Sequence, residues 1–267
     1  MDLISHAYVL ASLGSHVEQQ NALATLASQE TPAVNMIILQ AVDKLLAGQV
    51  RPELQLDLLE LAGKRSEPII KEKIQKFESS RSSGDPMSFY SEVLAGGNAE
   101  AGHNVFFDKP EAGCIACHTI NGKGGAVGPN LTGIGSRKSR EYLLTALMDP
   151  NKDIAEGFLT LEVTTKDGTI VSGLVKSETD RALIVNSAED GEVEVVKADI
   201  TKSERASSPM PLEMVKALPK RDVRDLLEFL CSLKEPLKQK PSTETPNGIT
   251  IGKEALPTSN SPVAQKR

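Results

Sequence analysis

Cys114-Ile115-Ala116-Cys117-His118 is the most informative stretch of this chain of 267 residues. One helical turn places two thiols spaced in this way on the same side and directs the imidazole of the next residue toward the same ligand. Each thiol can add to a vinyl group of a porphyrin, and the imidazole can then bind the iron. The stretch therefore predicts covalent attachment of haem c through Cys114 and Cys117, with His118 as an axial ligand.

Two other kinds of site use closely spaced cysteines. A structural zinc site needs four nitrogen or sulfur ligands, and outside this stretch the chain offers Cys231 and three other histidines, with no second pair at zinc-finger spacing. A redox dithiol follows the first strand of a βαβ unit, whereas a helical pattern precedes Cys114. Haem is therefore favoured, and a zinc-binding interaction protein is kept as an alternative.

A glycine-rich segment follows the cysteines, because residues 122–131 read GKGGAVGPNL. Glycine backbone needs no clearance for a side chain, so this segment can run close along a flat ligand, although an ordinary surface loop is the alternative. A ligand histidine also needs an acceptor for its second ring nitrogen. We expect the region of Pro129 to supply that acceptor.

The second axial ligand of the iron must come from another part of the chain. Met210 lies between Pro209 and Pro211, which stiffen the backbone of a loop at low entropic cost. The other candidates are Met148, Met214, His103 and an open position. A thioether ligand predicts an electron carrier, whereas an open position predicts a haem enzyme of a peroxidase-like kind.

Residues 1–80 are predicted to form a HEAT-like helical segment of the α-solenoid kind. Proline near the first turn begins three of the expected helices, and their apolar stripes suit antiparallel helix pairs. The expected helices are Gln19–Ala27, Val34–Leu46, Pro52–Leu61 and Pro68–Phe77. Residues 81–97 begin with a polar stretch rich in Ser, Gly and Pro and are predicted to be a linker.

Residues 98–234 are predicted to form a mainly helical domain with a β insertion at about 157–203. Helices are expected from Asn98, over Ser139–Met148 and from Val223 onward. Within the insertion, alternating apolar and polar residues around two glycine turns predict a small antiparallel β-barrel of the SH3-like or Sm-like kind. The tail, 235–267, is rich in Pro, Ser and Thr and is expected to be disordered.

The charge of the chain restricts its partners. Thirty basic and 36 acidic residues give a net charge of −6, which argues against a nucleic-acid partner. No run approaches the ~20 apolar residues of a membrane helix, so no membrane span is expected. The first residues lack the pattern of an export signal.

Together these parts resemble a class I c-type cytochrome over about residues 90–234. Asp149-Pro150-Asn151 and Ser208-Pro209-Met210-Pro211, with a β insertion between them, are similar to the planctomycete and verrucomicrobial haem-binding domain. The resemblance implies axial ligation by His118 and Met210. It also implies that the carbonyl of Pro129 orients the histidine.

The resemblance implies a helix crossing and a wider context as well. The first and last helices of the domain would cross at Gly102, with Phe106 and Phe229 beside it. The chain would transfer electrons to or from a redox partner protein or a dehydrogenase domain. Because related haem domains often close long secreted proteins, we expect a periplasmic or otherwise exported protein, and either this chain is a fragment of it or the start of the chain is misplaced.

Overall fold

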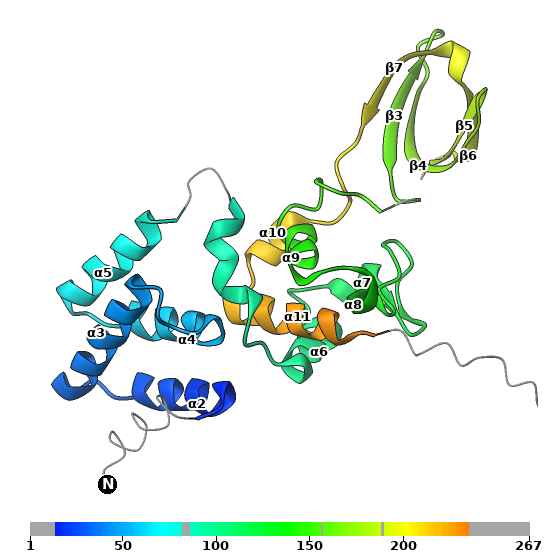
Figure 1. Cartoon of the computed structure of the whole chain (residues 1–267). Coiled ribbons are helices and arrows are strands. Elements are labelled where there is room, and N and C mark those ends of the chain that lie inside the picture. The colour runs from blue at the N-terminus through cyan, green and yellow to red at the C-terminus, as the bar shows by residue number, and fades with distance from the viewer. Residues whose placement is uncertain (1–13, 82–85, 156, 188–189, 235–267) are drawn as a thin grey trace, which may run out of the picture. The chain divides into compact units, whose positions relative to one another are not determined.

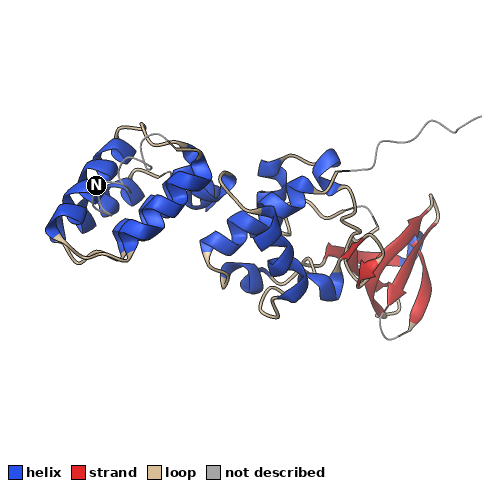
Figure 2. Ribbon diagram, turned by 90° about the horizontal axis from the view of Figure 1, so that it is seen from below, coloured by secondary structure: helices blue, strands red, loops and turns tan. Residues whose placement is uncertain are grey.

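The computed structural model describes residues 14–81, 86–155, 157–187 and 190–234, and the predicted tail 235–267 lies outside these ranges. Helices dominate the described chain, and the longer strands, red in Figure 2, form one sheet. The mainly helical class predicted from the sequence is therefore present.

Four helices near the N-terminus share a core of aliphatic side chains such as Val34, Ile38 and Val42. Their sequence signals are local: proline begins three of them, and the Thr31 hydroxyl accepts a hydrogen bond from the Val34 amide. The helices are α2 (His16–Ala27), α3 (Pro32–Leu46), α4 (Pro52–Gly63) and α5 (Pro68–Ser79), and α2 packs on α4 while α3 packs on α5 (Figure 1). The four predicted helices are confirmed, and their HEAT-like character stays a prediction.

A 3-10 helix, η1 (Pro86–Leu94), occupies much of the segment that the sequence predicted to be a linker. Its Val93 is fully buried in the core of the following domain. Its Glu92 is also buried, and its carboxylate forms ion pairs with Lys220 and Arg81. Residues 86–94 therefore belong to the packed structure, while the exact domain boundaries stay a prediction.

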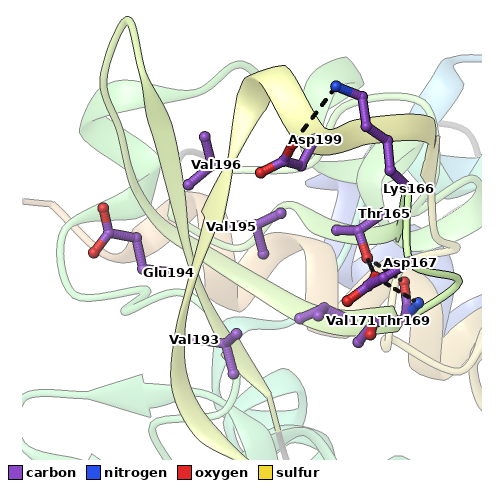
Figure 3. Close-up of a pocket in the computed structure, with 10 residues that line it drawn as sticks. All are labelled: Thr165, Lys166, Asp167, Thr169, Val171, Val193, Glu194, Val195, Val196 and Asp199. Atoms are coloured by element: carbon purple, nitrogen blue, oxygen red, sulfur yellow. Dashed lines mark hydrogen bonds and ion pairs between the residues drawn. The ribbon is translucent and has the colours of Figure 1, made fainter.

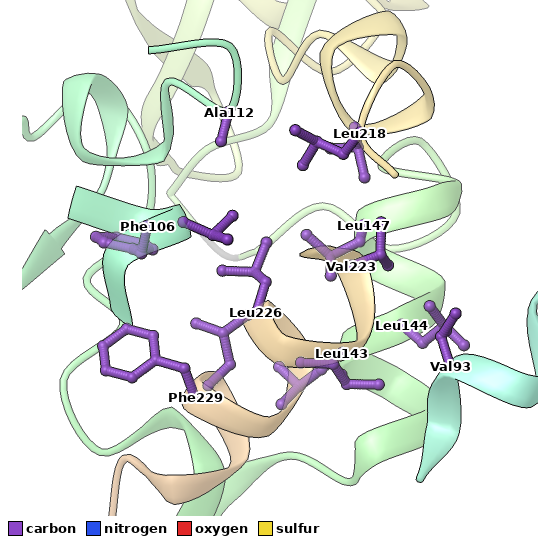
Figure 4. Close-up of a cluster of buried hydrophobic side chains, with 14 of the residues drawn as sticks. Val93, Phe106, Ala112, Leu143, Leu144, Leu147, Leu218, Val223, Leu226 and Phe229 are labelled. Carbon is purple, nitrogen blue, oxygen red and sulfur yellow. The ribbon is translucent and has the colours of Figure 1, made fainter. Parts of the chain in front are cut away.

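The second helical region surrounds the cysteine motif. Its core joins side chains from segments far apart in sequence, among them Phe106, Leu144 and Leu226, and Figure 4 shows them converging. The elements are α6 (Ala99–Asp108), α7 (Cys114–Cys117), β1 (Thr119–Ile120), β2 (Lys123–Gly124), α8 (Ile134–Arg137), α9 (Arg140–Met148), α10 (Leu212–Lys216) and α11 (Lys220–Ser232).

Helices α6 and α11 pack closely against each other at Gly102. A Cβ on Gly102 would lie 1.9 Å from the Asp225 carbonyl oxygen and 2.8 Å from the Cβ of Phe229. The Phe106 and Phe229 ring centroids are 5.9 Å apart beside the crossing. The helix crossing implied by the resemblance is therefore present, with the expected glycine and aromatic residues at it.

Replacing Gly102 by Ala should destabilise the fold by about 1–3 kcal/mol, because a methyl group there collides with backbone that no rotamer change can move aside. The free energy of unfolding in urea measures the effect. Gly63 is the matched control, since it is also helical and nothing lies within 4 Å of its would-be Cβ. Gly63→Ala should stabilise the chain by about 0.4–1 kcal/mol, and equal effects of the two variants would contradict the packing argument.

Between α9 and α10 the chain forms a five-stranded antiparallel sheet in the order β6-β5-β4-β3-β7. The strands are β3 (Thr160–Thr165), β4 (Ile170–Glu178), β5 (Ala182–Ser187), β6 (Gly191–Val196) and β7 (Ile200–Arg205), with the 3-10 turn η2 (Lys197–Asp199) between the last two. One face holds a small core that includes Val163, Val185 and Val195. Four of the strands match the predicted alternation.

The sheet is not closed into a barrel, so the predicted SH3-like or Sm-like barrel is not confirmed. In the described ranges no ladder joins the two edge strands, β6 and β7. Both edges carry charged side chains, with Glu192 and Glu194 on β6 and Lys202 and Glu204 on β7, and charged edges disfavour strand pairing. The sheet also extends to Arg205, beyond the predicted end of the insertion.

Candidate functional site

The cysteine motif forms a single helical turn, α7, bounded by two changes of backbone direction. Gly113 precedes the turn in the left-handed region with φ +55°, and His118 ends it in an extended conformation. The His118 amide donates to the Cys114 carbonyl oxygen at 3.0 Å. Helix α7 therefore places the two cysteines at its two ends, and His118 follows directly with an extended backbone.

The glycine-rich segment packs directly on this turn. The Gly125 amide donates to Ile115 at 2.9 Å, and the Gly128 amide donates to Cys117 at 2.8 Å. A Cβ on Gly125 would lie 1.9 Å from the Ala116 carbonyl oxygen. The sequence predicted that these glycines allow close approach to a flat ligand, and the structure shows that Gly125 allows close approach to the motif's own backbone.

His118 is held at one ring nitrogen and on one side of the ring. Its Nδ1 lies 2.9 Å from the Pro129 carbonyl oxygen, so the tautomer that makes this hydrogen bond carries its proton on Nδ1. A Cβ on Gly128 would lie 2.7 Å from Cε1 of the ring. Nε2 then keeps its lone pair, which is the arrangement that an iron-binding histidine requires.

Cys114 and Cys117 are half-buried, and neither forms a disulfide. Burial raises the pKa of the Cys114 thiol to about 11, and its Sγ lies 3.5 Å from the Ala112 carbonyl oxygen. A redox dithiol depends on a thiol whose pKa is lowered, so the environment of Cys114 does not favour that alternative. Two half-buried thiols one turn apart, next to an imidazole that is held at Nδ1 and packs against Gly128, fit a covalently bound haem.

The candidates for the second axial ligand have different surroundings. Met210 is half-buried and packs on the same core as Cys114. Met214 is in α10, with its methyl group against Gly113, and Met148 is buried inside the core. His103 is on the surface of α6, stacked on Phe107 with ring centroids 4.5 Å apart. The structure therefore places Met210 and Met214 near the motif or its core and His103 in an aromatic cluster.

Sequence reasoning gave no role to Asn151, which follows the end of α9. Its side-chain oxygen accepts a hydrogen bond of 2.7 Å from the Ser208 amide, 57 residues further along the chain. The available signal was a side chain that favours turns, placed directly after Asp149-Pro150. The partner, however, lies beyond the whole β insertion, so only the fold reveals the contact.

A cavity of about 390 Å³ lies in the sheet, and Figure 3 shows Val171, Val193 and Val195 lining it. An ion pair between Lys166 Nζ and Asp199 Oδ1, 3.6 Å long, lies at its edge. None of the predicted site residues lines this cavity. Among the residues that the structure describes, no group of three or more His, Cys, Asp or Glu side chains could hold a metal ion.

Comparisons with known proteins agree with this site. Residues 99–169 match the family model for Cytochrome c, a stretch that contains the motif and Pro129 and ends before Met210. The chain is also 42% identical over 64 residues to "Cytochrome c" of Dictyostelium discoideum. The aligned stretch is 24% of this chain and 53% of that protein, so the chain spans about half the length of the curated relative.

Within the described residues, no helix is both long and apolar enough to cross a membrane. The residues that match the family model contain α6, the motif turn α7, α8 and α9. Residues 99–169 are thus similar to a cytochrome c domain, and the cofactor of that family is covalently bound haem c.

Proposed function

We propose that this chain transfers single electrons through a haem c attached to Cys114 and Cys117. The observation that carries the proposal is the His118 environment, in which the Pro129 carbonyl occupies Nδ1 and leaves Nε2 available for iron. The haem supplies one-electron chemistry, and the protein supplies its attachment, its orientation and the tuning of its potential.

We further propose that His118 and Met210 are the two axial ligands. Met210 lies in a loop stiffened by Pro209 and Pro211, and its side chain packs on the core that also contacts Cys114. Methionine ligation stabilises the reduced iron and raises the reduction potential. These features support an electron carrier rather than a haem enzyme with an open coordination position.

We propose in addition that the chain works as part of a larger redox protein. The chain would be the haem module of a longer, exported protein of the planctomycete and verrucomicrobial type, where it would exchange electrons with a dehydrogenase domain or another redox protein. The β insertion between Asp149-Pro150-Asn151 and Ser208-Pro209-Met210-Pro211 supports this type. Detection of the protein in the periplasmic fraction of its source would support export, and its recovery in the cytoplasm alone would contradict it.

Replacing both Cys114 and Cys117 by Ser should abolish covalent attachment, because the hydroxyl groups do not form the thioether bonds. The chain is expressed with an export signal and the cytochrome maturation machinery, and denatured protein is tested for haem that resists extraction by acidic acetone. Wild type should retain its haem and the double variant should release all of it. Cys231→Ser is the control and should retain haem as wild type does, since Cys231 lies in α11 outside the motif.

Wild-type protein that loses its haem to acidic acetone would refute covalent attachment. Protein that contains zinc and no iron would support the zinc-binding interaction protein instead.

A further inference from the structure

The chain must leave the haem domain after α9, build the whole sheet and then return Met210 to the domain core. Its two crossing segments lie between α9 and β3 and between β7 and α10. The position of Met210 therefore depends on what holds the returning segment to the domain, since the sheet itself has its own separate core.

The outgoing segment is anchored to α9. The Tyr142 hydroxyl donates to the Asp153 carboxylate at 2.7 Å, and the Lys152 amide donates to the Asp149 carbonyl at 3.1 Å. Helix α9 in turn buries Leu143, Leu144 and Leu147 in the domain core. The outgoing segment is thus tied to the haem domain before the first strand of the sheet begins.

The returning segment is tied to the first residue of β3 at one point and to the outgoing segment at another. The Ala206 amide donates to the Thr160 carbonyl oxygen at 2.9 Å, and the Ser208 amide donates to Asn151 Oδ1 at 2.7 Å. The Met210 amide then lies 3.3 Å from the Ser208 hydroxyl oxygen. Hydrogen bonds therefore connect Asn151, which follows α9 in the chain, to Ser208 and Ser208 to Met210.

We propose that Asn151 is a positioning residue for the methionine ligand: it holds the returning loop on the haem domain so that Met210 stays on the iron. This inference rests on the proposed axial ligation by Met210 and adds a residue to it. Without the Asn151 side chain, the returning segment would keep the hydrogen bond from the Ala206 amide to the Thr160 carbonyl oxygen. That bond restrains only the residues directly after β7. Met210 would then leave the iron more often.

Imidazole binding to the oxidised holoprotein tests the proposal, because imidazole can occupy the position only when the methionine has left it. Loss of the hydrogen bond between the Asn151 side chain and the Ser208 amide destabilises the state in which Met210 binds the iron. The state in which Met210 has left the iron should therefore become roughly fivefold to tenfold more populated. The apparent dissociation constant of imidazole should fall for Asn151→Ala by the same factor. The weak far-red methionine-to-iron band should also disappear at lower temperature than in wild type.

Asn151→Asp keeps an acceptor for the Ser208 amide and should bind imidazole within about twofold of wild type. The matched control is Asp167→Ala, which removes a similar acceptor, 3.1 Å from the Thr169 amide, inside the β3–β4 turn. That variant should leave imidazole binding unchanged. Wild-type affinity in Asn151→Ala, or equal effects of Asn151→Ala and Asp167→Ala, would overturn the role of Asn151. A wild-type protein without the far-red band would refute ligation by Met210 itself.

Discussion

Replacing Met210 by Ala should abolish the weak far-red methionine-to-iron band and lower the reduction potential of the haem. A thioether favours the reduced iron, so its loss stabilises the oxidised form relative to the reduced one. Axial ligands set haem potentials over a range of about 0.8 V, and we expect a fall that is a substantial part of this range. Absorption spectra and a redox titration of the holoprotein measure the two effects.

The control for this variant is Met214→Leu, because Met214 is the other half-buried methionine near the motif. Leucine conserves most of its volume against Gly113, so the fold should lose less than about 1.5 kcal/mol and the band should remain. Loss of the band in Met214→Leu and its retention in Met210→Ala would transfer the ligand role to Met214. Rapid binding of cyanide to wild-type protein that lacks the band would instead favour a haem enzyme with an open position.

The helices and the attachment motif were predictable because their signals are local. Pro32, Pro52 and Pro68 each begin a helix, and the Asn98 side chain accepts from the Ala101 amide as a helix cap should. Two cysteines within one helical turn, followed at once by a histidine, also need no distant residue to predict their arrangement. Signals of this kind depend only on residues that are neighbours in sequence, so they can be read from a single sequence.

Features that depend on distant partners were missed or misjudged. Strand β7 reads ITKSER, in which only Ile200 is apolar, so its pairing with β3 leaves no alternating pattern. The segment of η1 follows a polar stretch and was predicted to be a linker, although Val93 is buried in the core. The contact of Asn151 with Ser208 was missed for the same reason, since its partner lies beyond the sheet.

A buried ion-pair cluster between α4 and α11 is the other feature that the sequence could not predict. The Asp57 carboxylate is only 3% exposed and accepts from Arg224 at 2.7 Å and from Arg221 at 2.9 Å. Arg224 is 4% exposed. Asp57→Ala would leave the Arg224 guanidinium buried without this partner, and removing one member of a buried pair costs about 3–5 kcal/mol. We therefore expect a loss of this size in the free energy of unfolding by urea.

The control is Asp43→Ala, which removes an aspartate that pairs with Lys73 between α3 and α5 and is half exposed. Because an exposed pair contributes about 0–1 kcal/mol, this variant should be nearly neutral. The double variant Asp57→Ala/Arg224→Ala should lose less than the sum of the single losses, since no buried guanidinium then remains at position 224. If Asp57→Ala costs no more than Asp43→Ala, the cluster does not hold α4 to α11, and the packing of both helices on η1 must do so instead.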